Sequence, residues 1–241
     1  MVVSTTQIAD ELTIKSELDR QTLRELGHLL LAAAGPPAMT YQEFLEWADE
    51  DTLAEWVNGE VIMTSPASNI HQDISDFLTS VMRAYVQTRN LGVVRSALFQ
   101  MKLKNGREPD LLFIQREHLA RLNPTYLDGP ADLVVEIVSP ESVSRDRGEK
   151  FYEYAEGGVS EYWIVDPNKT RADFYVLDGD YYSRAFVGAS GRYDAHTLPG
   201  FWLRVEWLWE TPLPSPIRTL AEIVGMDAEV LAAFEKALRG S

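Results

Sequence analysis

Four segments between residues 107 and 167 decide the fold: REPDLLFI begins at Arg107, DLVVEIVSP at Asp132, RDRGEKFYEY at Arg145 and EYWIVD at Glu161. The apolar runs of the first, second and fourth segments are short and rich in β-branched or aromatic residues, which is typical of strands buried on both faces. The third segment predicts a helix over residues 145–157, with two glycines at its C-terminal end.

Each of the first two apolar runs carries a carboxylate. Asp110 directly precedes the first run, and Glu136 lies inside the second. A bare carboxylate among apolar neighbours costs several kcal/mol or more, so each must be paired, hydrogen-bonded or bound to a cation. Two such carboxylates followed by Lys150 predict a site for a divalent metal.

A hairpin is predicted over residues 54–63. Asn58-Gly59 lies between two strand-like runs, and Asn-Gly is the strongest short hairpin signal. In that register Glu55, Val57, Glu60 and Ile62 share one face of the hairpin, and Trp56, Val61 and Met63 share the other. The carboxylates of Glu55 and Glu60 could serve a metal site, although a paired acidic face is more often solvated.

An amphipathic helix is predicted from His71 to about Asn90, on Ile74, Phe77, Leu78, Val81, Met82 and Tyr85. Ser68 and Asn69 are possible N-caps. His71 lies in the first turn, where a histidine is usually structural or exposed. Its functional use would be a hydrogen bond to a phosphate or to an attacking water.

The composition excludes several classes of protein. The chain of 241 residues has no Cys, which excludes disulfides and thiolate metal sites. It contains no long apolar run and no visible secretory signal, so we expect a cytoplasmic protein without a membrane partner. The net charge of −15 argues against a broad basic surface for nucleic acid. A bound Mg²⁺ would still reverse the local field for a phosphate.

Segments on both sides of this stretch complete the expected organisation. We expect an N-terminal helical arm over residues 1–38, a central domain over residues 39–210 and a C-terminal helical tail over residues 211–241. A capping box at Thr40 to Glu43 predicts a short helix. Alternation predicts strands over residues 93–104 and 201–209, and amphipathicity predicts a last helix over residues 227–238.

Common catalytic motifs are absent: the chain has no P-loop, G-x-G-x-x-G, H-E-x-x-H or G-x-S-x-G. What remains is Pro109-Asp110, then Glu136-Ile137-Val138, then Lys150. This ordered set resembles the PD-(D/E)XK nuclease superfamily and, within it, the Uma-type family of restriction-endonuclease-like proteins. The matching segments are EWVNGE from Glu55, SP from Ser65 with His71, EPD from Glu108, VEIVSP from Val135, DRGEK from Asp146 and GVSEYW from Gly158.

The resemblance implies an α/β (α+β) fold, restriction-endonuclease-like, with a mixed central β-sheet flanked by helices and the site at one edge. It implies an endonuclease that cuts nucleic acid, most simply DNA, with Mg²⁺ or Mn²⁺ as cofactor. Asp110, Glu136 and the Ile137 carbonyl would hold the metal. An N-terminal acidic residue often joins the site in the superfamily, and Glu55 is the candidate here.

The chain departs from the superfamily at Val138, where a lysine is common. Val138 shares a face with Glu136 in a strand, and its side chain leaves room there. We expect Lys150 to extend its ammonium into that place from the following helix, with Asp146 beside its stem. The alternative is an ordinary surface Asp-Lys pair.

Two other classes of protein stay open. One is a catalytically inactive binding or assembly module of the same fold, which the acidic charge and the missing lysine favour. The other is a metal-free hydrolase with two carboxylates, such as a glycosidase. The amphipathic terminal segments and the need for two sites in a double-strand cut lead us to expect a homodimer.

Overall fold

The structure, a computed structural model, describes residues 38–48, 52–63 and 67–240. The predicted N-terminal arm therefore lies, except for its last residue, outside the described residues. The described helices are α3 (Tyr41–Trp47), α4 (Asn69–Arg89), η1 (Arg116–Arg121), η2 (Arg145–Glu149), α5 (Lys150–Gly157), η3 (Pro167–Lys169), η4 (Val205–Trp209), α6 (Pro216–Val224) and α7 (Ala228–Leu238). None of them combines the length and the apolar content that crossing a bilayer requires.

Thirteen strands form three sheets in the described part of the chain. The six-stranded sheet has the order β11 (Tyr181–Gly188), β10 (Arg171–Asp178), β9 (Glu161–Asp166), β8 (Leu133–Ile137), β6 (Leu111–Gln115) and β3 (Gly92–Ser96). The five-stranded sheet has the order β2 (Glu60–Met63), β1 (Ala54–Val57), β5 (Gly106–Arg107), β4 (Gln100–Lys102) and β7 (Tyr126–Asp128). β12 (Arg192–Asp194) and β13 (Trp202–Arg204) form the third.

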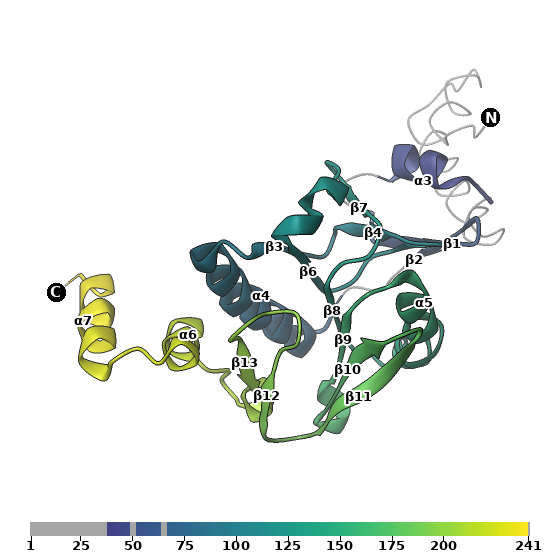
Figure 1. Cartoon of the computed structure of the whole chain (residues 1–241). Coiled ribbons are helices and arrows are strands. Elements are labelled where there is room, and N and C mark those ends of the chain that lie inside the picture. Colours follow the sequence, from purple (N-terminus) through teal and green to yellow (C-terminus); the bar gives the residue numbers. More distant parts are fainter. Residues whose placement is uncertain (1–37, 49–51, 64–66, 241) are drawn as a thin grey trace, which may run out of the picture.

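The six-stranded sheet is the centre of a mixed α/β fold, as predicted. Its middle strands β8 and β9 are parallel, while the other pairs are antiparallel. Figure 1 shows α4 and α5 on opposite sides of this sheet. One face packs on α4 around Phe113, Val135 and Trp163. The other face packs on Tyr154 of α5 and on Met101 of the five-stranded sheet.

The predicted hairpin is confirmed in register. Val57 pairs with Glu60 and Glu55 pairs with Ile62, and Asn58 and Gly59 both have positive φ, at 52° and 93°. This is the backbone of a two-residue turn whose twist matches that of the strands. The hairpin adds β1 to the edge of β5 and so brings Glu55 into the interior.

The helix predicted from His71 to about Asn90 is also confirmed. It is α4, which begins two residues earlier, at Asn69. Ser68 is the N-cap, and its side chain accepts a hydrogen bond from the His71 N–H at 3.4 Å. Asn90 ends the helix in the left-handed conformation. The cap fixes where the first turn begins, and therefore where His71 lies.

Two predicted strands are wrong in extent. The predicted strand over residues 93–104 is two strands: β3 pairs with β6 in the six-stranded sheet, and β4 pairs with β5 and β7 in the five-stranded sheet. Alternation is a local signal and does not reveal a chain that passes from one sheet to another.

The predicted strand over residues 201–209 stops at Arg204 and continues as the 3₁₀ helix η4. Its partner β12 pairs with it through only three residues. Phe201, Leu203, Val205 and Trp207 are still buried. The alternation therefore identified the buried side chains correctly, but the backbone conformation after Arg204 is helical and not extended.

The C-terminal segment contains one predicted helix and one that the sequence analysis missed. α7 begins after its N-cap Asp227, as predicted, but none of its residues is buried. α6 begins at Pro216, and proline is favoured at the first helical position because its missing N–H would have no partner there. Ile223 of α6 belongs to the apolar core beside α4.

Candidate active site

A cleft of about 490 Å³ opens where β8 ends, between the two large sheets. The residues that line it include every predicted site residue: Glu55, His71, Asp110, Glu136, Ile137 and Lys150. They come from the hairpin, from the first turn of α4, from the loop before β6, from the end of β8 and from the start of α5. Glu60, the alternative to Glu55, is exposed on the other strand of the hairpin and does not line the cleft.

Lys150 is the centre of the cleft's charge arrangement. Its Nζ lies 2.9 Å from Glu55 Oε1, 3.0 Å from Glu136 Oε1 and 3.5 Å from Asp146 Oδ1. The lysine is 5% exposed, so these contacts hold a charge that water does not solvate. Three carboxylates raise the pKa of Lys150 above its ordinary value against the opposing effect of burial. Its ammonium is therefore charged.

Glu136 reaches Lys150 from the middle of the sheet. Tyr154, one turn along α5, donates its hydroxyl to Glu136 Oε1 at 2.7 Å. Val138 is buried on the same face, and α5 packs over it, which is the placement that the sequence predicted for the lysine. Whether Lys150 takes part in a reaction stays a prediction. Burial and the neighbouring carboxylates Asp146, Asp110 and Glu55 raise the pKa of Glu136, although Lys150 opposes this.

Asp110 joins three elements. Its Oδ2 accepts the N–H of Ile137 at 2.6 Å, and its Oδ1 lies 2.8 Å from His71 Nε2. The carboxylate is thereby fixed against the end of β8. The hydrogen bond and the charge of Asp110 raise the pKa of His71, although burial alone would lower it.

Glu55 is held by a buried network that the sequence analysis missed. Arg107 is 1% exposed, and its guanidinium lies 3.2 Å from Glu55 Oε2 and 2.7 Å from Glu153 Oε2. Burial alone would raise the pKa of Glu55, but Lys150 and Arg107 lower it. Arg107 therefore ties the hairpin to α5, the helix that carries Lys150.

Acidic groups outnumber basic groups in the cleft. Seven Asp or Glu residues and three basic residues are among the described residues that line it. Burial and the neighbouring Glu55 raise the pKa of Glu108 to about 7. Burial also raises the pKa of Asp146, whose Oδ1 has no hydrogen-bond partner among the described residues and lies 3.5 Å from Lys150 Nζ. Carboxylates in this position lack sufficient positive charge, and an additional cation would stabilise them.

The donor atoms suit a hard divalent cation, because Mg²⁺ and Mn²⁺ prefer carboxylate and carbonyl oxygens. Within the described ranges, no three Asp, Glu or His side chains form a ready-made metal site. The predicted ligand set needs only two side chains, Asp110 and Glu136, with the Ile137 carbonyl. These residues fit the metal in chemistry, and Lys150 lies where it would compete with a cation for Glu136.

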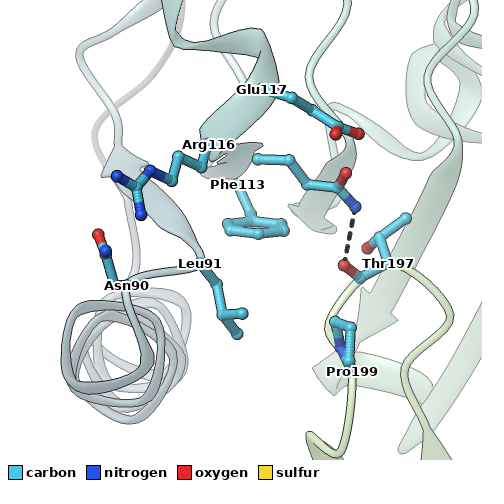
Figure 2. Close-up of a pocket in the computed structure, with 8 residues that line it drawn as sticks. Asn90, Leu91, Phe113, Arg116, Glu117, Thr197 and Pro199 are labelled. Carbon is cyan, nitrogen blue, oxygen red and sulfur yellow. Dashed lines mark hydrogen bonds between the residues drawn. The ribbon is translucent and has the colours of Figure 1, made fainter.

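A second, smaller pocket of about 240 Å³ lies at the C-terminal end of α4. Figure 2 shows the Phe113 ring and Leu91 against the pocket, with Arg116 and Glu117 at its polar side. Gln115 donates to the Thr197 carbonyl at 3.1 Å across it. None of the predicted site residues lines this pocket, so the cleft at the end of β8 is the candidate active site.

Comparisons with known proteins agree with this fold. The family model described as "Uma2: Putative restriction endonuclease" matches residues 41–206. The structure is similar to the crystal structure of a putative nuclease belonging to DUF820 from Anabaena variabilis ATCC 29413, with a TM-score of 0.62 at 16% sequence identity. That likeness covers 71% of this chain and 97% of the other. No curated protein matches. Since the family model spans more than half of the sequence, this chain belongs to the Uma2 family of putative restriction endonucleases.

Proposed function

We propose that this protein is a metal-dependent endonuclease that hydrolyses phosphodiester bonds of nucleic acid, with DNA as the substrate. The observation that carries the proposal is the convergence of Glu55, Asp110, Glu136 and Lys150 in one cleft. These residues are far apart in the sequence, and each has the chemistry that phosphodiester hydrolysis with a metal needs. Membership of the Uma2 family and a nuclease-like fold support the same conclusion.

Asp110, Glu136 and the Ile137 carbonyl would hold Mg²⁺ or Mn²⁺. When bound, the metal would lower the pKa of a water molecule and stabilise charge developing on the phosphate. Lys150 would stabilise the same charge from the side of α5. Its contact with Asp146, at 3.5 Å, is the longest of its three, so that N–H is the donor that can turn towards a phosphate. Glu55 holds the ammonium in place, and His71 holds Asp110.

A second candidate is an inactive binding or assembly module. The observation that favours it is the closed ion-pair cluster: Lys150 already contacts three carboxylates, and the described residues contain no site of three acidic or histidine side chains for a metal. The two functions differ in metal binding and in turnover. A module would bind its partner without a divalent metal and would leave DNA intact.

The first prediction concerns Asp110→Asn. Calorimetric titration with Mn²⁺ is expected to show binding to the unchanged protein and at least about tenfold weaker binding to the variant, because one charged ligand is lost. The same variant is expected to show no cleavage of supercoiled DNA in the presence of Mg²⁺. Asp76→Asn is the matched control, because Asp76 also lines the cleft and its carboxylate contacts Gln72. Equal metal binding by all three proteins would contradict the metal assignment.

The second prediction concerns assembly, because a double-strand cut needs two sites. We propose a homodimer that buries the outer face of α7, where Val230, Phe234 and Leu238 are exposed. Light scattering at tens of micromolar is expected to give twice the mass of one chain. Phe234→Glu is expected to give a monomer. Ala232→Glu adds the same charge to the opposite side of α7 and is expected to leave the dimer intact. A monomeric unchanged protein would contradict this proposal.

A further inference from the structure

Arg145 is the one basic residue that lines the cleft without an ion pair among the described residues. His71 contacts Asp110, and Lys150 contacts three carboxylates. The Nε of Arg145 is buried and has no hydrogen-bond partner in the described structure. An unsatisfied buried donor costs about 1–3 kcal/mol, so an acceptor that enters the cleft would stabilise this side chain.

A π-turn directs Arg145 into the cleft. The N–H of Lys150 bonds to the carbonyl of Arg145, five residues back. In an α-helix, residues five apart point about 140° away from each other, so Arg145 would face away from Lys150. The wider turn stacks residue 150 over residue 145, and as a result Arg145, Asp146 and Lys150 all line the cleft. Single π-turns of this kind are frequent at functional sites.

The charge of the cleft indicates what the acceptor would be. The carboxylates of the described lining outnumber its basic groups, and Lys150 is already engaged by three of them. A polyanion such as a nucleic-acid strand would be repelled unless a free cation met its phosphates. The planar guanidinium of arginine offers paired N–H donors that match two oxygens of one phosphate.

We propose that Arg145 is a phosphate-binding residue, which anchors a backbone phosphate of the nucleic acid in the cleft beside Lys150. This inference rests on the proposed nuclease function and adds to it the side chain that holds the substrate. The competing possibility is a surface pair of Arg145 with Glu141, four residues earlier, which also lines the cleft. Such a pair would contribute a few tenths of a kcal/mol to stability and nothing to binding.

The test measures the affinity for a fluorescein-labelled DNA duplex by anisotropy, with Ca²⁺ in place of Mg²⁺ and over a series of salt concentrations. Arg145→Ala is expected to weaken binding about tenfold and to reduce the slope of log affinity against log salt by about one. Arg145→Lys is expected to recover the salt slope, because it keeps the charge, but only part of the affinity, because it loses the paired donors.

Arg116→Ala is the matched control. Arg116 lines the other pocket, has no ion pair within the described ranges and lies among no predicted site residues (Figure 2). Its loss removes the same net charge and is expected to leave affinity and salt slope nearly unchanged. Equal binding by the unchanged protein and by Arg145→Ala would overturn the assignment of Arg145 alone. If the unchanged protein bound no nucleic acid, the proposed function would fail first and the assignment with it.

Discussion

Lys150→Met is expected to destroy the proposed nuclease activity and to lower the stability of the metal-free protein. Lys150 is the common partner of Glu55, Glu136 and Asp146, and all four side chains are buried. Without the ammonium these carboxylates repel one another, and removing one member of a buried ion pair costs on the order of 3 kcal/mol. Loss of a group that stabilises transition-state charge is expected to reduce the cleavage rate at least about 100-fold.

A measurement with metal ions tests whether these effects come from the ion pairs of Lys150 with Glu55, Glu136 and Asp146. Because Lys150 would compete with a bound cation for Glu136, Mn²⁺ is expected to raise the melting temperature of Lys150→Met more than that of the unchanged protein. A merely structural lysine on the surface would show neither effect. Lys169→Met is the control, since Lys169 is exposed and lies outside the cleft.

A second substitution tests the place that Lys150 occupies. Val138 faces the same side of β8 as Glu136 and is buried beneath α5. Adding Val138→Lys to Lys150→Ala is expected to restore part of the activity, because the new ammonium would approach Glu136 along the strand. Full activity of Lys150→Ala alone would contradict the proposal that this lysine replaces the one missing at position 138.

Arg107→Met is expected to cause the largest loss of stability. The substitution keeps most of the side-chain volume but leaves Glu55 and Glu153 buried without their shared cation. Breaking such a pair costs about 3–5 kcal/mol, which lowers the melting temperature by on the order of 10 °C for a chain of this size. The deficit is expected to shrink at acidic pH, because Glu55, whose pKa Arg107 helps to lower against the effect of burial, needs no cation once it is protonated.

Two further variants separate charge from packing at this position. Arg107→Met with Glu153→Gln is expected to recover part of the stability, because one of the two buried carboxylates that lost the guanidinium is then neutral. Arg192→Met, which breaks the exposed pair with Asp194, is expected to change the melting temperature little, since water and salt screen that pair. Equal losses from Arg107→Met and Arg192→Met would contradict the role given to burial.

Local signals in the sequence determined much of this protein. Asn58-Gly59 specifies the turn and the register of the hairpin, and the register decides that Glu55 pairs with Ile62. Apolar runs identify the strands around Asp110 and Glu136. The physical demand that buried carboxylates find a partner was enough to predict that these two and Lys150 would share one place.

Only the tertiary structure decided the rest, because those contacts join residues that no local pattern relates. Nothing near Arg107 in the sequence indicates that its partner is Glu153, 46 residues later. The passage of the chain from β3 in one sheet to β4 in the other, and the π-turn at Arg145, likewise have no local signal in the sequence. The periodicity of apolar residues indicates which face of a helix or strand is buried. It does not indicate which residue packs against that face, because that partner comes from a distant part of the chain.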